Sequence, residues 1–137
     1  MIKVAFQGAR GAFSEDAAAE LFGGDIDFLP CIHLKDVFQA VLADEISFGV
    51  VPVENSQAGS INETYDLLLT YPLNIFAEVI LRISHCLMAL PGGKLADIRT
   101  IYSHPQALAQ CEEFLSQLEV EIIPTYDTAG SAKMIKE

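Results

Sequence analysis

The stretch from Phe48 to Leu69 constrains the fold of this chain more than any other. It opens with Phe48–Val53, an apolar and mostly β-branched run that predicts a strand buried on both faces of a parallel sheet. A polar corner follows at Glu54–Gln57. Ser60 and Glu63 then have the spacing of a capping box, which predicts the start of a helix. A strand, a polar corner and a capped helix in succession indicate an α/β fold.

The polar corner lies where ligands bind in open α/β sheets, beyond the carboxyl end of a strand. A helix start presents unpaired backbone N–H groups and a partial positive charge, so this corner could hold an anion without a basic side chain. No Lys or Arg occurs between Lys35 and Arg82. A plainer interpretation stays open, in which Asn55 and Ser56 only shape a turn.

Strand and helix alternate through the first 70 residues, which predicts a parallel α/β lobe. Ser14 is the expected N-cap of the first helix, and Gly23 suits its far end. His33 is expected at the surface or as the cap of the second helix. Before the Phe48–Val53 strand, the expected strands are Ile2–Phe6 and Ile26–Leu29 and the expected helices are Glu15–Phe22 and Leu34–Leu42.

After Pro72 the pattern changes. Asn74–Leu90 is a long apolar stretch that predicts two strands, or one long bent strand, crossing into a second lobe. We place the lobe boundary near Tyr71–Glu78, which gives a first lobe of residues 1–75 and a second of residues 76–137.

The second lobe is expected to contain two further strand-to-helix units. The first unit is the strand Thr100–Tyr102 and a helix from Pro105 through Leu118, which Ser103 or His104 caps. The second unit is the strand Val120–Pro124 and a last helix, which Asp127 or Thr128 caps and which runs to Glu137. No closing strand follows that helix, so the second lobe is expected to be interrupted.

Charge and composition exclude several function classes. The formal net charge is -11 and the eight basic residues are scattered, so nucleic acid is not expected as a partner. Three cysteines without a C-x-x-C pair argue against disulfides and zinc. With neither a signal peptide nor an apolar run long enough for a membrane span, we expect a cytoplasmic protein with no membrane association.

Cofactors and nucleophilic catalysis are poorly supported. Gly8 and Gly11 are too few and wrongly spaced for a dinucleotide fingerprint, and the three histidines are too far apart to form a common metal site. We therefore expect no nucleotide site and no metal. Ser103 and His104 are adjacent in sequence and no nucleophile elbow is present. His85 is expected to be a core or hydrogen-bonded histidine.

Four strand-to-helix corners carry small polar residues, and we expect their helix starts to converge on one small anion with two or more carboxylates. The corners are Gly11–Ser14, Asn55–Ser60, Ser103–Gln106 and Asp127–Ser131.

Five segments resemble successive motifs of the prephenate dehydratase family, in the family's order. They are Phe6–Ala18, Gly49–Leu68, His85–Gly92, Ser103–Cys111 and Tyr126–Ile135. The resemblance implies a two-lobed α/β fold like the type 2 periplasmic binding proteins, with an active site between the lobes. It also implies a lyase of phenylalanine biosynthesis that converts prephenate to phenylpyruvate with loss of water and carbon dioxide, without a cofactor.

The resemblance also implies which residues act. The residues that match the family's active-site positions are Asn55, Ser56, Ser103, Gln110 and Thr128. Further expected substrate-binding residues are Gly11, Ala12, Phe13, Ser14, Glu54, Gly59, His104, Gln106 and Ala129. The amide of Gln110 could face the cleft or the solvent.

The chain also departs from the family. The Thr-Arg-Phe motif and the regulatory ACT domain of the family are absent from this sequence. We therefore expect the amino-terminal part of a catalytic domain. As an isolated chain it is expected to have impaired activity and to form homo-oligomers. Two alternatives stay open: an arogenate dehydratase, and a module of the same fold that binds a small carboxylate without catalysis.

Overall fold

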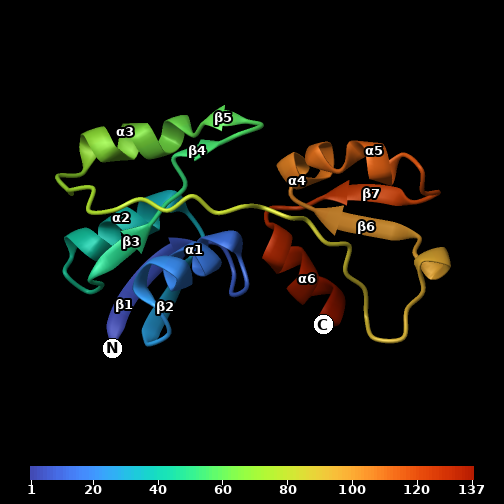
Figure 1. The fold of residues 1–137 in the computed structure, drawn as a ribbon, viewed down its shortest axis with the longest axis horizontal. Coiled ribbons are helices and arrows are strands. Elements are labelled where there is room, and N and C mark those ends of the chain that lie inside the picture. Colours follow the sequence, from blue (N-terminus) through green and yellow to red (C-terminus); the bar gives the residue numbers. More distant parts are fainter. The chain divides into compact units, whose positions relative to one another are not determined.

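Two compact units make up the chain, Met1–Arg82 and Ile83–Glu137 (Figure 1). They are seen in a computed structural model that describes all 137 residues. No helix in it is both long and apolar enough to cross a lipid bilayer.

A three-stranded parallel sheet forms the centre of the first unit. Its strands are β1 (Ile2–Gln7), β2 (Ile26–Cys31) and β3 (Phe48–Val50), in the order β2-β1-β3. Val4, Ala5 and Phe6 of the central strand are fully buried, because β1 has a strand on each side and contacts both α1 (Phe13–Phe22) and α2 (Leu34–Leu42). The predicted parallel α/β arrangement of this unit is confirmed.

The predicted amphipathic helix at residues 34–42 is confirmed as α2, since Leu34, Val37 and Phe38 are buried. Its start is fixed by hydrogen bonds between the N-cap residue His33 and Asp36. The backbone N–H of His33 donates to the carboxylate of Asp36 at 3.2 Å, and the backbone N–H of Asp36 donates to the backbone carbonyl of His33 at 3.1 Å. His33 therefore caps the helix, one of its two expected roles.

The strand predicted at Phe48–Val53 is shorter and more open than expected. It ends at Val50, and both Phe48 and Val50 are only half-buried. The reason is that β3 lies at the edge of the sheet and that Pro52, which has no N–H, cannot extend a strand ladder. The prediction of a strand buried on both faces was therefore wrong.

Two predicted helix caps were also wrong. Ser60 lies in β5 (Gly59–Ser60), which pairs antiparallel with β4 (Glu54–Asn55). Helix α3 (Asn62–Thr70) follows after Ile61 with no side-chain cap, because the hairpin places Ser60 outside the helix start. Likewise Ser14 lies inside α1, whose N-cap is Ala12.

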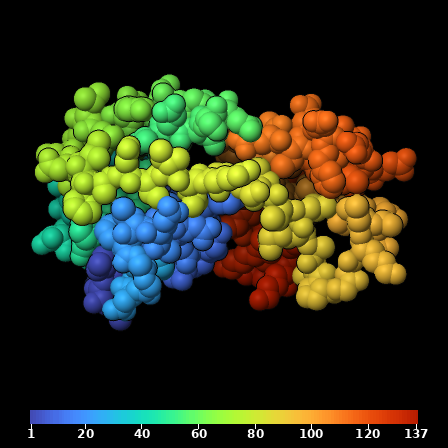
Figure 2. Space-filling model, viewed as in Figure 1, coloured from blue at the N-terminus to red at the C-terminus, as the bar shows by residue number.

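The segment Asn74–Leu90 forms no strand, contrary to the prediction. A strand needs a hydrogen-bonded neighbour, and the three sheets contain only β1 to β7. The segment is a drawn-out length of chain, coloured from green-yellow to yellow in Figures 1 and 2, and many of its apolar side chains are exposed.

The second unit contains a two-stranded parallel sheet of β6 (Thr100–Ser103) and β7 (Glu121–Pro124). Its other elements are a short 3-10 helix at Leu95–Asp97, α4 (Pro105–Gln110), α5 (Glu112–Leu115) and α6 (Thr128–Lys136). The single helix expected up to Leu118 is broken at Cys111, whose ψ of 7° departs from the helical range. After this break Leu115 is buried, whereas Phe114 remains 47% exposed.

Candidate active site

The β4–β5 hairpin holds the polar corner of the first unit. The side-chain Oδ1 of Asn55 accepts hydrogen bonds from the backbone N–H groups of Gln57 at 2.9 Å and Ala58 at 3.2 Å. Gly59 has a φ of +77°, which favours glycine. Asn55 therefore shapes this turn, and the group with which it can bind a carboxylate is its side-chain NH₂. Glu54 and Ser56 beside it are exposed, whereas Asn55 is half-buried.

The corner after β1 is organised by an ion pair. The backbone N–H of Gly11 donates to the Glu15 carboxylate at 2.8 Å, and the Arg10 guanidinium lies 2.9 Å from the same carboxylate. Arg10 also lies over the ring of Phe28, 5.0 Å from its centroid. The N–H of Gly11 is thus satisfied within the chain, so binding at this corner depends on other groups. Among the expected binding residues here, Ala12 is buried, whereas Phe13 and Ser14 are half-buried in the first turn of α1.

The sequence did not indicate that Arg10 is held at this corner. Its two contacts could not be read from the motif that contains it, because Glu15 lies on the following helix and Phe28 on another strand. Because β1 and β3 are parallel neighbours, their carboxyl ends lie at the same edge of the sheet, and the corner and the hairpin come after those ends. The structure therefore brings the two expected binding segments of the first unit to one edge.

In the second unit, His104 serves as the cap of α4. Its Nδ1 accepts a hydrogen bond from the backbone N–H of Gln106 at 3.1 Å, and Pro105 occupies the first helical position. Ser103, the last residue of β6, is half-buried. Of the two caps that the sequence allowed, the structure selects His104.

Gln110, at the end of α4, is oriented by a histidine 25 residues earlier in the chain. His85 Nε2 and Gln110 Oε1 lie 2.7 Å apart, and both residues are half-buried. Because a carbonyl oxygen can only accept, His85 is the donor and the side-chain NH₂ of Gln110 is turned away from it. The expectation that His85 is hydrogen-bonded is confirmed, but its link to a candidate catalytic residue was missed.

The start of α6 carries the last expected site residues, Thr128 and Ala129, both half-buried. Asp127 caps this helix by accepting from the backbone N–H of Gly130 at 3.0 Å. Because β6 and β7 are parallel, with Ser103 opposite Pro124, the starts of α4 and α6 lie at one edge of this sheet. The site residues of the second unit therefore share an edge, as those of the first unit do.

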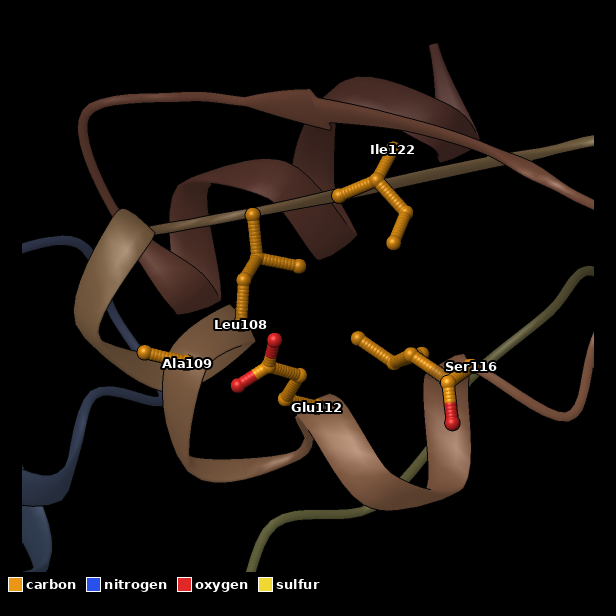
Figure 3. A pocket seen from close by; sticks show the side chains of 6 residues that line it. Leu108, Ala109, Glu112, Ser116 and Ile122 are labelled. Atoms are coloured by element: carbon orange, nitrogen blue, oxygen red, sulfur yellow. The ribbon is translucent and has the colours of Figure 1, made fainter.

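A hollow of about 420 Å³ in the second unit is a separate feature (Figure 3). Its lining is mainly apolar, includes the carboxylate of Glu112 and contains none of the expected site residues. It is lined by Leu108, Ala109, Glu112, Leu115, Ser116 and Ile122. A single carboxylate with no cation among the lining residues disfavours a dianionic ligand here. No three His, Cys, Asp or Glu side chains are grouped so as to hold a metal ion anywhere in the structure.

Comparison with known proteins decides the family. The model of the family described as prephenate dehydratase matches residues 4–137. The chain belongs to this family. It is 45% identical over 134 residues to a protein of Arabidopsis thaliana named arogenate dehydratase/prephenate dehydratase 2, chloroplastic, and covers 35% of that protein's length.

Two solved structures are similar to this member of the prephenate dehydratase family. One is a prephenate dehydratase of Arthrobacter aurescens in complex with L-Phe, with 33% identity and a TM-score of 0.91, of which the chain covers 46%. The other is GqqA, described as a novel type of quorum quenching acylase, with 35% identity, a TM-score of 0.88 and 49% coverage. In each case 98–99% of this chain is aligned.

These likenesses confirm the predicted fold class, an α/β fold like that of the type 2 periplasmic binding proteins. The chain spans about a third of the length of the curated relatives it matches. The roles of the individual site residues stay predictions.

Proposed function

We propose that this chain supplies part of the catalytic domain of a prephenate dehydratase, which converts prephenate to phenylpyruvate. The observation that carries the proposal is the match of the prephenate dehydratase family over residues 4–137. We assign residues 1–75 and 76–137 to the two lobes of that domain, with the substrate held between them and no cofactor.

The reaction requires that two carboxylates be oriented and that a hydroxyl group leave. The ring carboxylate departs as carbon dioxide, its electron pair enters the ring, and the ring hydroxyl leaves with a proton as water. The ring becomes aromatic, so the enzyme's task is to position the substrate and to assist the leaving group.

Neutral donors suit this task. In our proposal the side-chain NH₂ groups of Asn55 and Gln110 and the hydroxyls of Ser56, Ser103 and Thr128 hold the substrate. Neutral hydrogen bonds hold a carboxylate without stabilising its charge so strongly that its loss as carbon dioxide is opposed. The turn around Asn55 and the His85–Gln110 hydrogen bond support this role, because each occupies the amide oxygen and leaves the NH₂ as the presented group.

Arogenate is a second candidate substrate. The name of the Arabidopsis thaliana relative gives both substrates. Arogenate carries an ammonium group where prephenate carries a keto group, so the field of a chain with net charge -11 repels it less. This long-range effect acts on the association of the substrate rather than on the chemical step.

Two non-dehydratase functions compete with the proposal. A module that binds a carboxylate without catalysis would use the same corners. An acylase, the activity in the description of GqqA, would require a nucleophile or an activated water. The Nδ1 of His104 accepts the backbone N–H of Gln106, which disfavours its use as a base for the adjacent Ser103.

The test is turnover of prephenate and arogenate by the purified chain, with phenylpyruvate and phenylalanine followed separately and spontaneous decay subtracted. We expect phenylpyruvate above the background, at a lower rate than a full-length family member gives, and a lower kcat/KM with arogenate. Substrate binding without product would favour the binding module, and a higher kcat/KM with arogenate would reverse the substrate assignment.

The expected cytoplasmic location stays a prediction, and the Arabidopsis thaliana relative is named as chloroplastic.

A further inference from the structure

Two side-chain hydroxyls contact each other at the start of α6, in the second unit. Ser131 lies near the start of that helix and is only 4% exposed, and Thr125, between β7 and α6, is half-buried. Ser131 Oγ and Thr125 Oγ1 lie 2.5 Å apart. Both also lie close to the backbone carbonyl oxygen of Asp127, Ser131 Oγ at 2.6 Å and Thr125 Oγ1 at 3.2 Å. Neither residue has a role in the proposed function.

The order of donors among these groups follows from their protons, since each hydroxyl has only one to donate. Two short hydrogen bonds form if Ser131 donates to the carbonyl of Asp127 at 2.6 Å and Thr125 donates to Ser131 Oγ at 2.5 Å. The alternative, in which Thr125 donates to the carbonyl, uses the 3.2 Å contact in place of the 2.6 Å one. The distances therefore favour a directed chain from Thr125 through Ser131 to Asp127.

The carbonyl at the end of this chain belongs to the same peptide group as the N–H of Thr128. That group is planar and trans, so its N–H points away from its C=O. Holding the carbonyl of Asp127 therefore fixes the direction of the Thr128 N–H. As the first residue of α6, Thr128 has an N–H without a partner inside the helix. Hydrogen bonds in a chain polarise one another, so the bonded carbonyl makes this N–H a stronger donor.

Thr125 also joins the start of α6 to a second candidate site residue. Its backbone N–H donates to the backbone carbonyl of Ser103, the last residue of β6, at 2.8 Å. Helix α6 lies against β6 (Figure 1). The placement of Ser103 relative to Thr128, on two different elements, therefore depends on Thr125.

We infer that Thr125 and Ser131 are positioning residues for substrate binding. Their hydroxyls hold and polarise the peptide between Asp127 and Thr128, so that the N–H of Thr128 donates to a carboxylate of the substrate. This inference rests on the proposed function, because prephenate supplies the carboxylate. A backbone donor at a helix start binds a carboxylate without a full positive charge, as the neutral side-chain donors of the proposed site do.

The test is a titration of the ¹⁵N-labelled 137-residue chain with prephenate, in the parent and in three variants. Ser131→Ala removes the donor to Asp127. Thr125→Val keeps the shape of the side chain but removes its hydroxyl, whereas Thr125→Ser keeps the hydroxyl but removes the methyl group. Ser116→Ala is the matched control, because the Ser116 hydroxyl bonds the backbone carbonyl of Glu113 at 2.8 Å, in the same unit but outside the candidate site.

The dissociation constant of prephenate should rise in a fixed order. Ser131→Ala should weaken binding roughly tenfold and Thr125→Val roughly threefold, whereas Thr125→Ser and Ser116→Ala should each change it less than about twofold. The amide ¹⁵N signal of Thr128 in the ligand-free chain should move in the same order, because it responds to hydrogen bonding at the preceding carbonyl. A packing role alone predicts the reverse order at position 125, since Thr125→Ser loses a methyl group that Thr125→Val keeps.

Either of two results would overturn the inference. They are a Thr125→Ser variant that departs further from the parent than Thr125→Val, and a Ser131→Ala variant that binds prephenate as tightly as Ser116→Ala. A parent chain that binds no prephenate would instead contradict the proposed function. The order of the Thr128 signals in the ligand-free chain would then by itself support or overturn the positioning of that peptide group.

Discussion

The side-chain hydroxyl of Thr64 donates a 2.6 Å hydrogen bond to the backbone carbonyl of Pro52. Thr64 lies in the first turn of α3 and is fully buried, whereas Pro52 lies between β3 and the β4–β5 hairpin. The backbone N–H of Ile61 also donates a hydrogen bond to the backbone carbonyl of Val53, at 2.9 Å. These bonds join α3 to the chain that leads into the hairpin, so they fix the base of the turn that carries Asn55.

Thr64→Val should lower the free energy of unfolding by about 1–3 kcal/mol, because the carbonyl of Pro52 loses its donor while it stays covered by a side chain of similar shape. The measurement is urea denaturation. Thr70→Val is the matched control, since the Thr70 hydroxyl also bonds a backbone carbonyl, that of Asp66 at 2.8 Å, but is exposed. An equal effect at both positions would contradict the role assigned to Thr64.

Gly49→Ala should destabilise the first unit by about 1–3 kcal/mol through overpacking. A Cβ at Gly49 would lie 2.8 Å from a methyl group of Val37 and 3.2 Å from one of Val41, because α2 packs directly on β3. Gly24→Ala is the control, since its added methyl group meets no atom within 4 Å. A difference of less than about 0.5 kcal/mol between the two variants in urea denaturation would show that α2 can move away at no cost.

Cys31 should make stability fall at alkaline pH. Burial, and to a lesser extent the nearby Asp36 carboxylate, raise the pKa of the Cys31 thiol above its ordinary value of 9.0. As the pH rises past 9.0 the unfolded thiol loses its proton first, so the unfolded chain binds fewer protons and the unfolding free energy falls until the folded thiol also ionises.

The measurement for Cys31 is urea denaturation at about pH 8 and about pH 10, with Cys31→Ala as the control. The decline should be smaller in the variant than in the parent. Equal declines in the parent and the variant would show that Cys31 makes no contribution to the pH dependence.

Exposed Cys86 should also react with iodoacetamide faster than buried Cys31 in the folded chain.

Two substitutions at His85 should distinguish the effect of its hydrogen bond to Gln110 from the effect of its size. His85→Gln keeps an N–H donor near the position of Nε2, whereas His85→Asn withdraws the donor toward the position of Nδ1. The side-chain amide signals of Gln110 in ¹H–¹⁵N spectra should be preserved by His85→Gln and should shift in His85→Asn. Prephenate turnover should fall in the same order, roughly tenfold for the Asn variant if one positioning bond is lost. Unchanged Gln110 signals in His85→Asn would contradict the positioning role.

Local patterns in the sequence predicted the elements that local forces determine. The spacing of Leu34, Val37 and Phe38 predicted α2, and the positions of His33 and His104 indicated helix caps. Asn55 does shape a turn, and this is compatible with binding because the turn uses only its side-chain oxygen.

Contacts between distant segments account for most of what sequence patterns did not predict. The apolar run through Val53 does not reveal that β3 is an edge strand, and the run at 74–90 does not reveal that it lacks a neighbour. The bond between His85 and Gln110 joins residues 25 apart, and the contact of Arg10 with Phe28 joins a loop to another strand. None of these pairings has a periodic signature.

The most direct test of the proposed site is a titration of the ¹⁵N-labelled chain with prephenate, compared with the same titration of Asn55→Asp. An aspartate keeps the oxygen that accepts from Gln57 and Ala58, but it replaces the NH₂ donor by a negative charge facing the substrate. We predict saturable shifts at the hairpin and at the starts of α4 and α6 in the parent, and a loss of binding of at least about tenfold in Asn55→Asp with the hairpin signals retained. Equal binding by the two proteins, or shifts confined to residues outside these corners, would contradict the account.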